Sequence, residues 1–438
     1  MEWLSLWMFP VLLVLVFLGI HVSVALVITA FSFGFFVFGD RIAIQSFGPV
    51  LQAGSNFVLA AIPLFVLMGA ILERSGIARR LFDAIQIWLG PLPGGLALAT
   101  IVMCAIFAAS AGVVGAVEIV VGLMAIPAMR AYSYDRGLIS GTICAGGSLG
   151  TIIPPSIVVV VYASIAQLSV GELLAGIMLP GLVMTALFLI YILGRCLLRP
   201  EDGPPVPNTA RVASLHRKLA ITASGLVPAA LLITAVLGSI LMGVASPTEA
   251  AAVGALGALI LALCYRECSW SMLQVSLAQT VKVTAMIMFT VLGGTMFTGM
   301  FAATGGGRLL AAIVVELGLS PAMLVTFFLA IIFAAGFVLD WISIVLICIP
   351  IFAPLVKLAG IDPVWFAVLV CIAIQTSYLT PPMAPSIFYL RAIAPPDFTY
   401  SHMYRGVVPF VAMQLVTLLL VALFPAIGTW LPKALFGN

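Results

Sequence analysis

Two double-proline segments interrupt apolar stretches of this chain, and each could form a binding site for a cation or an anion. They read "LGTIIPPS" at 149–156 and "YLTPPMAPS" at 378–386. Because proline lacks a backbone N–H, neither stretch can continue as a regular helix. An interrupted helix leaves carbonyl oxygens that can coordinate a hard cation such as Na⁺, and the positive N-terminal end of the following half-helix can hold an anion. The alternative is a proline kink that binds nothing.

Two carboxylates also lie inside apolar runs. Asp340 falls in "GFVLDWIS" and Glu118 in "GAVEIVVG". A charge at mid-depth in a membrane costs several kcal/mol unless it is paired or functional. Asp340 is therefore predicted to bind a cation, with a structural cap or an ion pair as the alternative. Glu118 is predicted either to be linked to an ion or to form a hydrogen bond inside the protein.

The composition indicates a membrane protein. Hydrophobic residues make up 63% of the chain and charged residues 8%, whereas soluble domains carry roughly 25% charge. We therefore predict an all-α polytopic membrane protein. The net charge of +3 forms no basic cluster that would suit nucleic acid. His21, His216 and His402 are too dispersed for a metal site, and acids are too sparse for an acid–base constellation, which argues against an enzyme.

The interrupted segments belong to a set of elements that occurs twice. The apolar runs 94–131 and 320–356 are too long for one crossing and too short for two, so we predict re-entrant helical hairpins. Two cramped full spans in each run are the alternative. Short segments of mixed polarity before them are predicted as helices lying in the membrane interface. In the first half, the scaffold helices are followed by the interfacial helix 77–90, the hairpin 94–131 and the broken helix 137–167. In the second half, the corresponding elements are the interfacial helix 305–316, the hairpin 320–356 and the broken helix 363–390.

The two halves are predicted to form an inverted repeat. Residues 1–198 form the first repeat and 218–438 the second, with the cytoplasmic linker 199–217 between them. Landmarks recur in the same order at similar offsets: Arg80 with Arg308, Pro93 with Pro321, Pro127 with Pro350, and Pro154 with Pro381. Most Lys and Arg residues fall on the cytoplasmic side if both termini are periplasmic, which gives each half an odd number of crossings. Inverted repeats with interrupted helices are typical of secondary transporters.

Four motifs carry a resemblance to a known family. They are "AIPLFVLMGAILERSG", "GSLGTIIPPSIVVVVYA", "GFVLDWISIVLICIPIFAPLV" and "YLTPPMAPSIFYLRAI". Together, over about residues 50–425, they resemble the large membrane subunit of the tripartite ATP-independent periplasmic (TRAP) transporters. The resemblance implies Na⁺-coupled import of an organic acid across the bacterial inner membrane by an elevator mechanism. It also implies a periplasmic substrate-binding protein and a small four-helix membrane subunit, here a separate chain, as partners, and no cofactor beyond the coupling ion.

Residues at the hairpin tips and helix breaks are the candidate ligands. The first predicted sodium site uses Ser110 and the carbonyl groups of Gly150, Ile153 and Pro155. The second uses Asp340, Thr380 and the backbone carbonyl of Met383, because a thioether is too soft for Na⁺, with Ser343 as a weaker candidate. Thr151, Ser156 and Ser386 are predicted to contact the substrate anion beside helix N-termini. Many members of the family carry a serine-rich first hairpin tip, whereas this chain has only Ser110 there.

Other readings of the chain stay open at this point. A stand-alone Na⁺/carboxylate symporter would have similar fold physics but would need no binding protein. A polytopic membrane enzyme would need clustered acids and histidines. A channel would conduct without saturable Na⁺ dependence, and inverted repeats of broken helices do not favour it.

Overall fold

A computed structural model describes residues 2–111, 115–207, 214–316, 318–381 and 384–437. Every regular element within these residues is a helix. Eight of the helical segments in these ranges are long and apolar enough to cross a membrane, judged by length and composition. The protein is therefore an all-helical polytopic membrane protein, as its composition predicts.

The helices follow one another along the whole chain. In the first half they are α1 (Glu2–Leu6), α2 (Met8–Phe17), α3 (Val22–Phe38), α4 (Ile42–Gly54), α5 (Ala61–Arg74), α6 (Ile77–Leu89), α7 (Gly95–Ala111), α8 (Ala116–Ala131), α9 (Arg136–Ser148), α10 (Ile157–Ala166) and α11 (Val170–Leu198). In the second half they are α12 (Leu215–Leu241), α13 (Pro247–Cys264), α14 (Trp270–Ala303), α15 (Gly306–Glu316), α16 (Pro321–Ala335), α17 (Trp341–Leu358), α18 (Pro363–Leu379), α19 (Pro385–Ile393), α20 (Tyr400–Leu423) and α21 (Ala426–Phe436).

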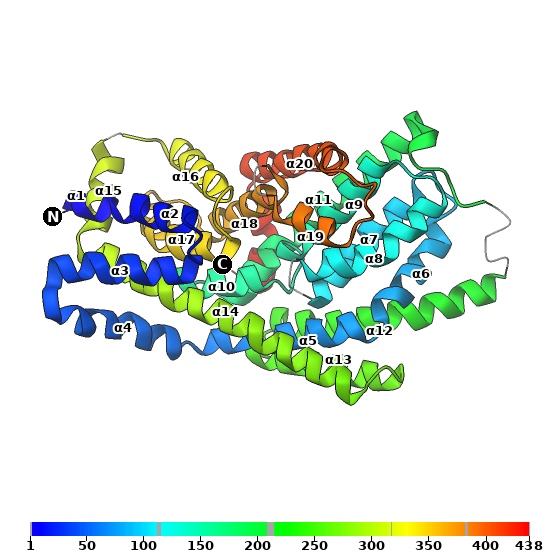
Figure 1. The fold of residues 1–438 in the computed structure, drawn as a ribbon, viewed down its shortest axis with the longest axis horizontal. Coiled ribbons are helices and arrows are strands. Elements are labelled where there is room, and N and C mark those ends of the chain that lie inside the picture. Colours follow the sequence, from blue (N-terminus) through cyan, green and yellow to red (C-terminus); the bar gives the residue numbers. More distant parts are fainter. Residues whose placement is uncertain (1, 112–114, 208–213, 317, 382–383, 438) are drawn as a thin grey trace.

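Most of these helices belong to one of two layers (Figure 1). The lower layer consists of α3, α4, α5, α12, α13 and α14, in which α14 contacts α3, α4 and α5. The upper layer consists of α7, α8, α9, α11, α16, α18, α19 and α20, in which α9 contacts α7, α8, α19 and α20. α10 and α17 contact each other, and α17 also contacts α14. These two helices therefore join the layers.

Two helix pairs occupy the predicted hairpins. α7 packs against α8, and α16 packs against α17. The structure bounds the first pair at 95–131 and the second at 321–358, close to the predicted 94–131 and 320–356. Ser320 caps α16 by accepting a hydrogen bond from the N–H of Met323, and proline occupies the first helical position.

The helix is interrupted at both double-proline segments. α9 ends at Ser148, a short 3-10 turn follows at Leu149–Thr151, and α10 begins at Ile157. α18 ends at Leu379 and α19 begins at Pro385. Prolines at 154 and 155 remove backbone donors from the first break, whereas Pro385 stands at the start of a helix, where a missing N–H costs nothing.

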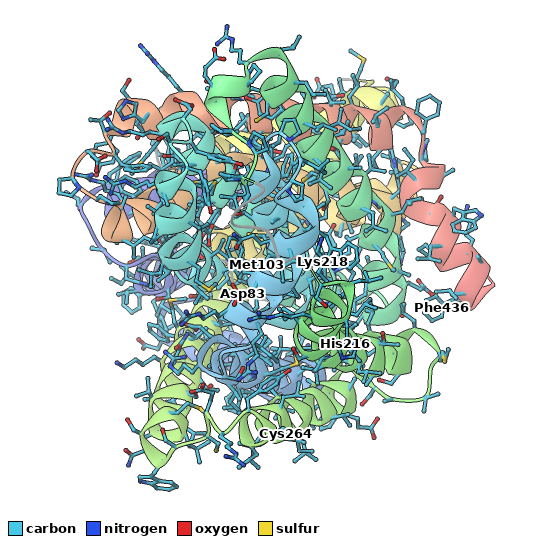
Figure 2. The ribbon with its side chains drawn as sticks, turned by 90° about the vertical axis from the view of Figure 1, so that its right-hand side faces the viewer. Asp83, Met103, His216, Lys218, Cys264 and Phe436 are labelled. Atoms are coloured by element: carbon cyan, nitrogen blue, oxygen red, sulfur yellow. The ribbon has the colours of Figure 1, made fainter. Side chains whose placement is uncertain are left out.

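α6 lies at the end of the molecule opposite the N-terminus, beside α12. Figure 2 looks at this end and labels Asp83 of α6 near His216 and Lys218 of α12. The indole N–H of Trp88 donates to the hydroxyl of Thr222 at 2.8 Å, and the Lys218 ammonium lies 5.8 Å from the Trp88 ring centroid. α6 buries its apolar stripe and keeps its charges outside, as a helix at an interface does.

The first part of the predicted linker 199–217 packs against the rest of the protein. Asp202 accepts a hydrogen bond from Arg195 Nε at 2.7 Å, and Val206 is buried. The N–H of Gly94 donates to the carbonyl of Gly203 at 2.8 Å. Residues 200–206 therefore pack against the loop that precedes α7.

α4 is a helix that the apolar pattern did not predict. It follows α3 after a short 3-10 turn at Gly39–Arg41, and the chain reverses direction there (Figure 1). Its sequence, "IAIQSFGPVLQAG", mixes polar residues with apolar ones and contains Pro49. A search for uninterrupted apolar runs passes over such a segment.

Candidate ion and substrate site

A cavity of about 420 Å³ lies where the two layers meet, and we call it the tip cavity. Residues at or next to the N-termini of three helices line it: Gly115 beside α8, Ile157 of α10 and Trp341 of α17. Tyr378 and Tyr389 border the second helix break, and Glu73 and Gln279 come from α5 and α14 of the lower layer. Because helix N-termini carry partial positive charge, their convergence favours an anion in this cavity.

α10 leaves its first backbone N–H groups available at this cavity. Ser156 is its N-cap residue, but its hydroxyl makes no capping bond and instead donates to the carbonyl of Thr151 at 2.7 Å. Ile157 and Val158, whose N–H groups belong to the first turn, line the tip cavity. The first turn of a helix has no intrahelical acceptor for these donors.

Glu118 connects the first hairpin to the second broken helix. Its side chain is completely buried, and it accepts hydrogen bonds from the N–H of Gly115 and from the hydroxyl of Ser386, the latter at 2.9 Å. It also packs against Gly147, where a Cβ atom would lie 2.3 Å from Glu118 Cδ. Of the two alternatives for Glu118, the structure shows the internal hydrogen bond.

Five backbone carbonyl groups at the first break have no hydrogen-bond donor among the described residues. They belong to Gly150, Ile152, Ile153, Pro154 and Pro155, which are buried except for the half-buried Ile153. Buried carbonyl groups are nearly always paired with a donor, water or an ion. The predicted backbone ligands of the first sodium site, Gly150, Ile153 and Pro155, are three of these five.

The predicted hydroxyl ligands of the substrate are all buried and already paired. The hydroxyl of Thr151 donates to the Ser148 carbonyl at 2.9 Å, that of Ser156 donates to the Thr151 carbonyl, and that of Ser386 donates to Glu118. Hydroxyl groups can still accept a bond while donating one. The structure brings Thr151 and Ser156 together and places Ser386 against Glu118.

Asp340 caps the second hairpin helix, α17. Its carboxylate accepts hydrogen bonds from the Ile342 N–H at 3.2 Å and from the hydroxyl of Ser343. Asp340 is exposed, while Ser343 is buried. The hydroxyl of Thr380 donates to the Thr376 carbonyl at 2.7 Å and makes no bond to Asp340. The capping role is therefore present, and the structure does not join Asp340 to Thr380.

Two predicted ligands lie outside what the structure describes. Met383 is not among the described residues, and Ser110 belongs to α7 but its side chain is not described.

Several polar groups near the breaks were not predicted from the sequence. Gln375 of α18 and Gln414 of α20 both donate to the Ser148 hydroxyl, at 3.2 and 3.3 Å. Tyr378 forms a hydrogen bond with Tyr389 and lies within electrostatic range of both Glu118 and Asp340. Isolated polar residues in the apolar run "VCIAIQTSYL" were the available signal for Gln375 and Tyr378.

A larger cavity of about 530 Å³ lies farther along α14 and α17. Thr295, Thr298, Arg308 and Pro350 are among its lining residues. The predicted site residues are not among the described lining residues of either cavity, but the tip cavity is lined by Ile157 and Trp341, the sequence neighbours of Ser156 and Asp340. We therefore assign the candidate site to the tip cavity.

Comparison with known proteins identifies the family. Residues 9–427 match the family described as "Tripartite ATP-independent periplasmic transporter, DctM component". A C4-dicarboxylate TRAP transporter large permease protein from Pseudomonas aeruginosa is 32% identical over 88% of each chain. An isethionate TRAP transporter permease protein, DctMQ, from Oleidesulfovibrio alaskensis is 27% identical over 85% of this chain and 58% of its own length.

The fold has a counterpart among solved structures. The YdaH transporter of Alcanivorax borkumensis superposes with a TM-score of 0.66 over 90% of both chains at 16% identity. At that identity the likeness shows the fold alone, whereas the sequence match covers almost the whole chain. This chain therefore belongs to the DctM family, the large permease component of the TRAP transporters, as its proline motifs predict.

Proposed function

We propose that this permease imports an organic anion together with Na⁺ by an elevator mechanism. The observation that carries the proposal is the set of carbonyl groups at Gly150, Ile153 and Pro155, which have no donor among the described residues. Backbone carbonyl oxygens are hard ligands that suit Na⁺, and unwound backbone at mid-depth is tolerated where it lines a protein cavity. Asp340 and the carbonyl groups around the second break are proposed as the second sodium site.

The proposed substrate is a carboxylate. The helix N-termini around the tip cavity favour an anion, and the relatives are named for transport of C4-dicarboxylates and isethionate. Thr151, Ser156 and Ser386 are proposed to turn their hydroxyl groups toward the substrate. Their present bonds involve neighbouring residues, so an anion of sufficient affinity would replace them.

The proposed architecture is an inverted repeat with two re-entrant hairpins. The helices α7, α8 and α16 have 17, 16 and 15 residues, and α17, which is among the eight candidate spans, has 18, whereas a span needs about 20. Each pair therefore suits a hairpin that enters and leaves from one face of the membrane. The upper layer together with α10 and α17, and therefore with both hairpins, is proposed to slide as one body against the lower layer.

The proposed orientation places both termini in the periplasm of a bacterial inner membrane. Basic residues then lie mostly on the cytoplasmic side. Two residues that line the tip cavity lie toward the cytoplasmic side in this orientation. Glu73 is next to Arg74 in α5, and Gln279, in the N-terminal half of α14, accepts a hydrogen bond from Arg74. The described conformation is therefore proposed to face inward.

The proposed partners are a small membrane subunit and a periplasmic substrate-binding protein. The isethionate relative DctMQ extends well beyond the region shared with this chain. The name DctMQ joins M and Q, so a Q-type small subunit is proposed as the partner of this chain within the lipid bilayer.

Uptake into proteoliposomes tests the proposal. The permease, its small subunit and its binding protein are reconstituted, and uptake of a labelled dicarboxylate is measured with an inward Na⁺ gradient or with choline in its place. We expect uptake only with Na⁺ and only with the binding protein. Equal uptake in choline would refute Na⁺ coupling, and full uptake without the binding protein would indicate a stand-alone symporter.

A further inference from the structure

Glu118 is a completely buried acid without a basic partner among the described residues. It takes part in none of the ion pairs found there. The hairpin residues 112–114, which the structure does not describe, are Gly, Val and Val and supply no charge. Burial of the carboxyl group carries a large desolvation cost in its ionised form. The N–H of Gly115, the hydroxyl of Ser386 and the N-terminus of α8 offset part of that cost, and a bound cation or a proton would remove it.

The helices packed around Glu118 offer poor ligands for a metal cation. Cys104 of α7 and Cys144 of α9 lie within its electrostatic range, and Gly147 of α9 fills one side. Thiol groups are soft ligands, whereas Na⁺ prefers oxygen. The one side-chain oxygen bonded to the carboxyl group among the described residues is the hydroxyl of Ser386.

The remaining titratable groups that face Glu118 are neutral or acidic. Tyr378 of α18 lies within electrostatic range and is hydrogen-bonded to Tyr389 of α19. Asp340 of α17 lies within electrostatic range of Tyr378 as well. A proton needs no coordination shell and therefore suits this environment better than Na⁺.

The carboxyl group of Glu118 lies next to the tip cavity. Gly115 lines the cavity and donates its N–H to Glu118. One residue therefore separates the buried carboxyl group from the cavity.

We propose that Glu118 carries a proton in this conformation, and that release and rebinding of this proton form part of the transport cycle. On release, the O–H bond of the carboxyl group breaks and the proton passes to water in the tip cavity. The carboxylate left behind keeps the N–H of Gly115 and the hydroxyl of Ser386 as donors. The proton is released after the solute has left the inward-facing carrier, and Glu118 is protonated again when the carrier faces outward. One proton would therefore enter with each solute in addition to Na⁺.

Infrared difference spectroscopy of the purified chain tests the first step without requiring transport. The variants are Glu118→Gln and, as a matched control, Glu249→Gln, because Glu249 also closes a capping box at a helix start but is exposed. At neutral pH, the difference spectrum between wild type and Glu118→Gln is expected to show the carbonyl stretch of a protonated acid. The difference spectrum between wild type and Glu249→Gln is expected to lack that band. If the Glu118→Gln difference spectrum contains only ionised-carboxylate bands, the proposal is wrong.

Transport assays test the second step. Glutamine keeps the neutral shape of the protonated acid but cannot release a proton. Glu118→Gln is therefore expected to lose net uptake by about tenfold or more, while exchange of internal for external solute continues. Net uptake at the wild-type rate, or equal loss of exchange in a folded protein, would contradict a proton step. Na⁺ dependence of the remaining exchange is expected to be unchanged, which separates this proposal from Na⁺ coupling.

Discussion

At the scale of single residues, Asp340 has two roles that a substitution can separate. It caps α17, and it is proposed to bind Na⁺. Asp362 offers a matched control, because it caps α18 by accepting from the N–H groups of Val364 and Trp365. Both Asp340→Asn and Asp362→Asn keep a side-chain oxygen that can accept the capping bond, and because Asn caps a helix about as well as Asp, little loss of stability is expected in either variant. Only the first is expected to raise the Na⁺ concentration for half-maximal uptake, by about tenfold.

Uptake measured over a series of Na⁺ concentrations decides between the two roles. If both variants shift the Na⁺ dependence equally, or neither does, Asp340 is a structural cap and the second sodium site is wrong. Thermal unfolding of both variants in detergent shows whether the two substitutions change the stability of the protein by a comparable amount.

Acidic residues whose burial in a membrane costs free energy could be recognised from the sequence, but the residues that they bond to could not. Asp340 and Glu118 stand out because each places a carboxylate in an apolar run. The Ser386 that donates to Glu118 lies 268 residues away. No periodicity specifies such a contact, because it depends on how α8 packs against α19. The capping bond from the N–H of Ile342 to Asp340 is local, and the alternative of a structural cap anticipated it.

At the scale of elements, glycines set how closely α9 and α20 approach. A Cβ on Gly141 would lie 2.1 Å from the carbonyl oxygen of Gly406, while one on Gly194 of α11 would meet nothing within 4 Å. Gly141→Ala is expected to destabilise the protein by about 1–3 kcal/mol through overpacking. Gly194→Ala is expected to be neutral or to stabilise by up to about 1 kcal/mol.

Thermal unfolding in detergent, followed by size-exclusion chromatography, measures both glycine variants. A Gly141→Ala protein as stable as wild type would mean that α9 and α20 are farther apart than the structure shows. Because both substitutions raise helix propensity equally, the difference between them isolates the packing effect.

Elements defined by strong local chemistry were predictable, and those that depend on packing were not. Prolines at 154 and 155 place the first break within a few residues, because missing donors end a helix whatever surrounds it. α4 escaped prediction because its polarity is mixed, and segment 200–206 escaped because its order depends on Arg195 and Gly94. The start of α13 is likewise defined by local chemistry, since the carboxylate of Glu249 accepts from the Ser246 N–H at 2.8 Å in a capping box.

At the scale of the whole molecule, sliding of one layer against the other predicts that a cross-link between them stops transport. A Cβ on Gly294 of α14 would lie 2.5 Å from the Cβ of Leu346 of α17. A disulfide needs about 3.8 Å between Cβ atoms, so a small local shift would accommodate Gly294→Cys with Leu346→Cys. Oxidation is expected to abolish uptake, and reduction is expected to restore it.

A second cysteine pair controls for the chemistry of oxidation. Gly254→Cys with Met68→Cys joins α13 to α5 within the lower layer, where a Cβ on Gly254 would lie 2.5 Å from Met68 Sδ. This pair is expected to leave uptake unchanged when oxidised. Normal uptake by a fully cross-linked Gly294–Leu346 protein would rule out relative motion of the layers at this contact.

The most direct test of Na⁺ coupling is a pair of high-resolution cryo-EM maps, one in sodium chloride and one in choline chloride. We expect the sodium chloride map to contain a density peak that contacts the carbonyl oxygens of Gly150, Ile153 and Pro155, and we expect this peak to be absent from the choline chloride map. Maps with no sodium-dependent peak at the first break, at a resolution that shows ordered water elsewhere, would contradict the account.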